Sequence, residues 1–130
     1  MATWDDIAAF VRSEYHVIED TGDEIRILIE YEDDRSQVII VCREVLDQRE
    51  DWVQIASVCG LVSDVDLRLV LKEIGETSVV CGAVIMGEHV VLRHSLPLLN
   101  LDINEFLDPL QLVADTADQL EETFFGGDGY

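Results

Sequence analysis

The alternation of apolar and polar residues between Ser78 and Leu98 predicts a β-hairpin late in the chain. Residues 79–86 are the first expected strand, Gly87-Glu88 the turn and residues 89–96 the second strand. A two-residue loop with glycine first is typical of a type II′ turn, whose twist matches that of paired strands. One face of this hairpin is expected to line the core: Val79, Cys81, Ala83, Ile85, Val90, Leu92, His94 and Leu96.

The opposite face of the hairpin is too apolar to serve only as a face toward water. With Met86 opposite His89, it carries Val80, Gly82, Val84, Met86, His89, Val91, Arg93 and Ser95. Such a face needs a cover, which points to binding rather than catalysis. Arg93 is either a surface arginine whose stem lies over valines or an anchor for a partner's carboxylate or backbone. The residues expected to contact a second copy or a client are Val80, Val84, Met86, Val91 and Arg93.

Apolar residues at helical spacing predict three helices. The first follows a capping box of Thr3 and Asp6, and its apolar positions are Trp4, Ile7, Ala8, Val11 and Tyr15. A second capping box, Ser63 with Asp66, precedes a helix with apolar positions at Leu67, Val70, Leu71 and Ile74, which Gly75 is expected to end. The C-terminal helix is expected to begin with Asp108 as N-cap and Pro109 as first residue, and to end at Gly126-Gly127.

Strand patterns occupy the region between the first two helices. They cover residues 16–18, 25–31, 38–45 and 52–59, and residues 60–63 are expected to be a break. The strand over 38–45 is apolar on both faces, so it is expected at the centre of a sheet, covered on both sides. The whole chain, residues 1–130, is therefore expected to be a single α+β domain: an antiparallel sheet of five to six strands with helices packed on it, in the order α-β-β-β-β-α-β-β-α.

The charge of the chain limits its partners. There are 28 acidic and 8 basic residues, a formal net charge of −20. This charge repels phosphate backbones and anionic lipids, so neither nucleic acid nor a membrane is an expected partner. The excess of acidic residues has four possible explanations. These are carboxylates that only keep the surface solvated, a basic partner, mimicry of a polyanion, and a salt-rich host.

Candidate chemistry is sparse. Cys42, Cys59 and Cys81 lie far apart and are expected to be free thiols in a reducing compartment, hence a cytoplasmic location, and no export signal or membrane span is recognised. A small enzyme that uses His94 with Cys81, or a cation held by the acidic loop 30–34, is the alternative to a binding module. No catalytic, cofactor or metal motif is recognised, so no enzymatic activity and no cofactor are expected.

Several motifs near the C-terminus are familiar. The segment Arg93-His94-Ser95-Leu96-Pro97-Leu98 resembles the exit of the last strand in bacterial YbjN-like proteins. Ala117-Asp118-Gln119-Leu120-Glu121 and the closing Gly126-Gly127-Asp128-Gly129-Tyr130 resemble motifs of their final helix and tail. The resemblance implies the fold that these proteins share with type III secretion chaperones, which are small, acidic, often homodimeric and bind extended client segments without catalysis. YbjN-like members are described as regulators of sensory transduction. The resemblance to them implies no catalytic residues in this chain.

Overall fold

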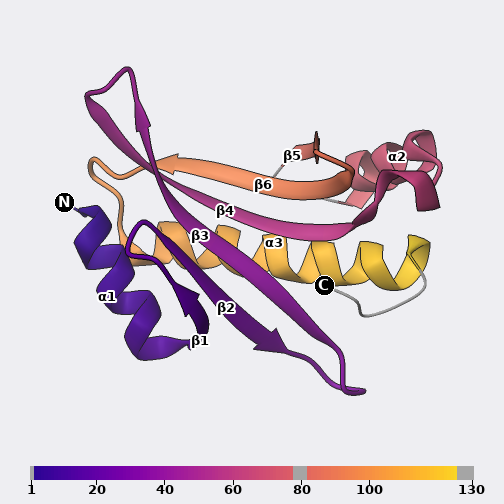
Figure 1. Ribbon diagram of the computed structural model, residues 1–130, viewed down its shortest axis with the longest axis horizontal. Helices are drawn as coiled ribbons and strands as arrows, with labels where there is room; N and C mark the ends of the chain where they lie inside the picture. The colour runs from indigo at the N-terminus through magenta and orange to yellow at the C-terminus, as the bar shows by residue number, and fades with distance from the viewer. Residues whose placement is uncertain (1, 78–81, 126–130) are drawn as a thin grey trace.

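The computed structural model describes residues 2–77 and 82–125 of the chain (Figure 1). Helices alternate with strands in the order expected from the sequence. The elements are α1 (Trp4–Glu14), β1 (His16–Asp20), β2 (Glu24–Glu30), β3 (Ser36–Leu46), β4 (Glu50–Leu61), the 3-10 turn η1 (Val62–Asp64), α2 (Leu67–Thr77), β5 (Gly82–Met86), β6 (His89–Pro97) and α3 (Ile103–Phe124).

The six strands form one antiparallel sheet in the order β1-β2-β3-β4-β6-β5. This confirms the α+β fold class and the expected element order. Strand β1 extends past the predicted 16–18, and residues 60–61, expected as a break, belong to β4. Because β6 pairs with β4 as well as with β5, the late hairpin is joined to the earlier strands into a continuous surface.

Helices α1 and α3 pack on one face of the sheet. In Figure 1, α3 runs behind the sheet along β3 and β4, and α1 lies beside β1. The apolar side chains of both helices form one core with the inward residues of the strands, among them Ile27, Ile39, Ile55 and Leu92. Burial of these side chains supplies the main drive for folding, at about 25 cal/mol per Å² of apolar surface.

The start of α1 is as predicted. The hydroxyl of Thr3 accepts a hydrogen bond from the backbone N–H of Asp6 at 3.2 Å, and the Asp6 carboxylate accepts one from the N–H of Thr3 at 3.0 Å. This capping box satisfies two N–H groups that the first helical turn leaves without partners. Trp4 is buried beneath it, and its indole N–H donates to the carbonyl oxygen of Gly22 at 2.8 Å.

The predicted start of the C-terminal helix is wrong. Helix α3 begins at Ile103 behind a capping box of Asp102 and Glu105, and it carries Pro109 in its interior. A proline there removes one backbone hydrogen bond, which normally disfavours the helix. The extra turn buries Phe106 completely in the core, however, so tertiary packing outweighs the local preference. The expected end of this helix, at residues 126–127, lies outside the described residues.

Helix α2 also differs from its prediction. Its N-terminal cap is Asp66, whose carboxylate accepts a hydrogen bond from the N–H of Arg68 at 3.0 Å, whereas Ser63 belongs to η1. The helix continues through Gly75 to Thr77, so Gly75 does not end it. Gly75 is exposed and has no positive φ, and a glycine of this kind weakens a helix without stopping it.

The register of the late hairpin is as predicted. Met86 pairs with His89 and Val84 with Val91, and Gly87 has the positive φ of 63° that a type II′ turn needs. Residues 78–81 lie outside the described residues, so the predicted places of Val79, Val80 and Cys81 are not tested. Of the residues expected in the core, Val90 and Leu92 are buried, but Ile85 is 55% exposed. That expectation was wrong because β5 is the edge strand of the sheet.

Candidate protein-binding surface

The face of the sheet that points away from α1 and α3 is the candidate site, called the open face here. In Figure 1 no helix of the described chain crosses in front of β2 and β3. The prediction that β3 is covered on both sides is therefore wrong for the described residues. Val38, Ile40 and Cys42 are only partly buried, whereas Ile39 and Val41, on the other face, are fully buried.

Strand pairing arranges the open face in rows that run across the sheet. One row runs from Arg26 on β2 through Ile40 and Ala56 to Arg93 on β6 and Gly82 on β5. The row therefore has an apolar centre with an arginine near each end. Neighbouring rows contain the pairs Leu28 with Val38, Val58 with Val91, Val84 with Val91, and Cys42 with Gln54.

The centre of the open face is hollowed. A depression of about 350 Å³ is lined by Glu24, Arg26, Ile40, Cys42, Gln54, Ala56, Val58, Met86, His89 and Val91. Ala56 and Val91 are 5% and 4% exposed although neither belongs to the main core. Longer side chains of the same face surround them, so the hollow has an apolar floor and a polar rim.

Most charges on the rim are already paired. Arg26 lies between two carboxylates, with its Nε 3.0 Å from Glu24 and 3.5 Å from Glu19. The Gln54 amide donates a hydrogen bond to the Glu44 carboxylate. Arg93, by contrast, is exposed, lies between the small residues Ala56 and Gly82, and makes no ion pair with any residue in the described ranges.

The thiol of Cys42 is part of this floor and is not activated. Burial, together with the nearby carboxylates of Glu44 and Glu24, raises its pKa to about 11. A nucleophilic cysteine needs a lowered pKa, so the environment of Cys42 favours a structural thiol. Its Sγ lies 3.8 Å from the side-chain oxygen of Gln54, a weak contact that holds it in the row.

The five predicted contact residues differ in their position and exposure in the structure. Val84, Val91 and Arg93 share the open face as predicted, and Met86 lies at its edge with 49% of its surface exposed. Val80 lies outside the described residues. Val91 is 4% exposed, so it contributes to the floor and not to an outer contact. The sequence reasoning missed the contribution of Ile40, Ala56 and Val58, although the two-sided apolar pattern of residues 38–45 signalled part of it.

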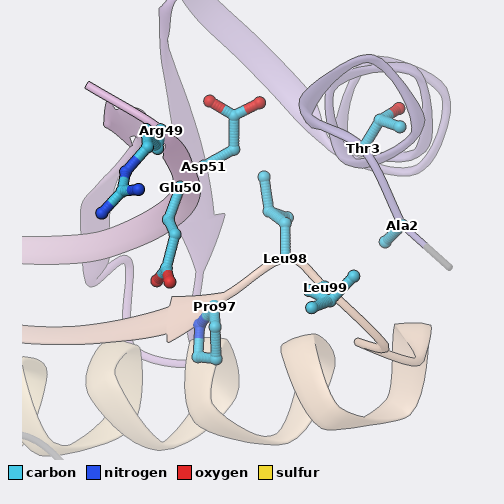
Figure 2. Close-up of a pocket in the computed structure, with 8 residues that line it drawn as sticks. All are labelled: Ala2, Thr3, Arg49, Glu50, Asp51, Pro97, Leu98 and Leu99. Atoms are coloured by element: carbon cyan, nitrogen blue, oxygen red, sulfur yellow. The ribbon is translucent and has the colours of Figure 1, made fainter. Parts of the chain in front are cut away.

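A second hollow lies at the end of the sheet near α1 (Figure 2). It measures about 440 Å³ and is lined by Ala2, Thr3, Arg49, Glu50, Asp51, Pro97, Leu98 and Leu99. The three charged side chains diverge in Figure 2 and do not converge on a common point. Because a specific polar ligand needs convergent groups, this hollow is a weaker candidate than the open face.

The alternative chemical sites lie only partly within the described residues, so the pairing of His94 with Cys81 is not tested. His94 is half-buried opposite Ile55, and Cys81 is outside the described residues. Asp33 and Asp34 form an exposed turn with φ of 63° and 59°. Within residues 2–77 and 82–125, histidine, cysteine and acidic side chains form no group of three or more that could hold a metal ion. Of the helices that the structure describes, none is both long and apolar enough to cross a membrane.

The fold is similar to that of a solved structure over most of the chain. It is a chain of the HopA1–SchA chaperone–effector complex, with 12% sequence identity, coverage of 88% of this chain and 89% of that chain, and a TM-score of 0.63. At this identity the likeness concerns the fold alone, and it agrees with the fold class expected from the sequence. No protein-family model and no curated protein matches this chain. The YbjN-like resemblance stays a prediction.

Proposed function

We propose that this chain is a non-enzymatic, chaperone-like protein-binding module that acts as a cytoplasmic homodimer and holds an extended segment of a client protein on the open face. The observation that carries the proposal is the apolar floor of Ile40, Ala56, Val58 and Val91, which no described helix covers. The fold shared with a chain of a chaperone–effector complex supports a protein as the ligand. The regulatory role implied by the YbjN-like resemblance would use the same surface.

The charges of the open face suggest what the client segment carries. Arg26 and Gln54 are engaged by carboxylates of the chain itself, whereas Arg93 projects from the sheet between two small residues. A guanidinium binds a carboxylate through two parallel hydrogen bonds. The favoured client segment therefore has apolar side chains for the floor and one acidic side chain that reaches Arg93.

A synthetic peptide tests this proposal. The probe is a peptide of about ten residues, the upper length of an ordinary strand, with alternating valine and serine and one central glutamate. Titration calorimetry measures its affinity, and tryptophan fluorescence gives a second readout because Trp52 lies half-buried on the open face whereas Trp4 is 5% exposed. We expect binding by the wild-type chain.

The charge of Arg93 provides the specificity control. Arg93→Glu is expected to weaken binding of the glutamate peptide roughly tenfold or more, as when one partner of an interface charge pair is lost. The same variant is expected to prefer a peptide with lysine at the central position. Leu112→Glu, on the outer side of α3, is the matched control and should bind as the wild type does. Equal affinity of the Arg93→Glu variant for both peptides would contradict the proposed contact.

A further inference from the structure

The hollow at the centre of the open face has room for one large side chain of a client. Its volume is about 350 Å³. Pockets of this size lie at the small end of the range for ligand sites, and a cavity of about 150 Å³ already admits a benzene ring. The hollow therefore matches a single aromatic side chain better than a molecule of the size of a cofactor, and a valine side chain leaves much of it empty.

Strand pairing explains why the hollow lies where it does. In the central row of the open face, Ala56 stands between the longer side chains of Ile40 and Arg93. Ala56 is 5% exposed, and Val91, which also belongs to the floor, is 4% exposed. A short side chain between longer ones leaves a depression with an apolar floor, and a ring that covers this floor releases the water in contact with it.

Two sulfur-containing side chains border the hollow. Cys42 comes from β3, and Met86 comes from β5 with 49% of its surface exposed. Burial is the main reason why the pKa of the Cys42 thiol is raised to about 11, so the thiol is neutral near pH 7. Sulfur in a thioether or a neutral thiol is polarisable and makes favourable contacts with the edge of an aromatic ring. This border favours an aromatic side chain over an aliphatic one.

The polar rim of the hollow indicates which aromatic residue fits best. Glu24, Arg26, Gln54 and His89 line the hollow beside its apolar floor. The Nε of Arg26 donates to Oε2 of Glu24 at 3.0 Å, and a carboxylate has further lone pairs for a second donor. A phenol hydroxyl is such a donor, because it sits at the end of an apolar ring that can cover the floor. Phenylalanine would cover the same floor and displace water from the carboxylate without replacing its hydrogen bond.

We propose that the hollow binds a tyrosine side chain of the client, with the ring over Ala56 and Val91 and the hydroxyl donating to Glu24. This inference rests on the proposed function and names the residue that anchors the client on the open face. Arg93 follows Val91 by two residues on β6, and residues two apart in a strand point to the same face. In an extended client segment, the same spacing places the tyrosine two residues from the glutamate that reaches Arg93.

Titration calorimetry of the full chain with matched peptides tests the anchor. The reference is the valine–serine peptide with a central glutamate, and in two further peptides tyrosine replaces the valine two residues before or two residues after the glutamate. We expect one tyrosine peptide to bind about tenfold or more tightly than the reference, because a ring buries more apolar surface than a valine side chain. Phenylalanine at the same position should bind roughly two- to tenfold more weakly than tyrosine, since one hydrogen bond is lost.

Variants of the hollow give the specificity controls. Ala56→Leu fills the hollow and should reduce the affinity of the tyrosine peptide to that of the reference peptide. Met86→Ala removes one sulfur from the border and should weaken binding of the tyrosine peptide roughly two- to tenfold. Ile85→Ala is the matched control, because Ile85 neighbours Met86 on β5 but points to the other face, and it should bind as the wild type does. Circular dichroism checks that each variant folds.

Methyl resonances of the wild-type chain report the position of the ring without any substitution. An aromatic ring shifts the NMR signals of methyl groups that lie over its face. The methyl groups of Ala56, Val58 and Val91 should therefore shift when the tyrosine peptide binds, and they should shift much less with the reference peptide. The methyl group of Val70, which is buried beneath α2 and outside the hollow, serves as the internal control and should not move.

The outcomes separate this inference from the proposed function. If the reference peptide binds and neither tyrosine peptide binds more tightly, the tyrosine anchor is overturned, whereas the open face remains the client surface. If no peptide binds, both proposals are overturned. A tyrosine peptide that binds equally well to Ala56→Leu and shifts no methyl signal of the hollow also overturns the anchor, because its ring then binds elsewhere. Tighter binding of leucine than of tyrosine at the same position would assign the hollow to an aliphatic side chain instead.

Discussion

Removal of the Arg35 side chain should cost the chain much of its stability. Arg35 lies in the loop between β2 and β3 and binds the last turns of α3. Its Nε and Nη2 donate to the Asp118 carboxylate at 3.2 and 3.1 Å, Nη2 also donates to the backbone carbonyl oxygen of Asp118 at 3.2 Å, and Nε lies 3.4 Å from the Glu122 carboxylate. The Arg35 and Asp118 side chains are only 17% and 14% exposed.

The burial of this pair sets the size of the effect. Loss of one partner of a fully buried ion pair costs about 3–5 kcal/mol, because the remaining charge is left without compensation. Exposed pairs contribute about 1 kcal/mol or less. Arg35 and Asp118 are mostly but not fully buried, so Arg35→Ala is expected to lower the free energy of unfolding by about 2–3 kcal/mol, by interpolation between these limits. For a chain of this length that is a fall in Tm of about 10 °C.

Urea unfolding followed by circular dichroism measures this loss. The matched control is Arg12→Ala, because Arg12 also binds a carboxylate, that of Asp20 at 2.7 Å, but its side chain is 44% exposed. We expect a clearly smaller loss for this control, since solvent screens the exposed pair. Equal losses in the two variants, or a larger loss for Arg12→Ala, would refute the view that the buried contact fastens α3 to the β2–β3 loop.

Four further predictions concern the core and the open face. The Cys42 thiol, with a pKa raised to about 11, should react slowly with a disulfide reagent at pH 8 and faster as the pH approaches that value; fast reaction at pH 8 would contradict its burial. Because its pKa is raised on folding, Cys42 should also make the chain less stable between its unfolded pKa of 9.0 and the folded value, measured by urea unfolding at each pH. Gly60→Ala should cost about 1–3 kcal/mol, because the new methyl group collides with the ring of Phe125; an unchanged Tm would place that ring elsewhere. Phe106→Ala should cost about 3–5 kcal/mol in urea unfolding, and a loss below about 1 kcal/mol would contradict its place in the core.

The elements predicted correctly from the sequence are those whose structure is determined by residues close together in the chain. The capping box before Trp4 and the alternation around Gly87 act over a few residues, and both were confirmed. The predicted start of α3 at Pro109 was wrong, because the local rule against proline inside a helix does not include the burial of Phe106. Ile85 was misplaced for a similar reason: alternation assigns a face, but only the strand order reveals that β5 lies at the edge.

The candidate site could be predicted only in part. The sequence pointed to the unclaimed face of the late hairpin, and Val84, Val91 and Arg93 do share a face. The rest of that face comes from β3 and β4, which join it because β4 pairs with β6. That pairing links residues far apart in the chain, and no local pattern encodes it. The floor formed by Ile40 and Ala56 therefore became visible only with the fold.

The most direct test of a binding role for the open face is hydrogen exchange of the full chain with and without the glutamate peptide. We expect added protection along β3, β4 and β6, around Ile40, Ala56 and Arg93, and unchanged exchange in α1 and α3. Protection confined to the helices, or none at a peptide concentration that saturates binding, would contradict the assignment of the open face as the client surface.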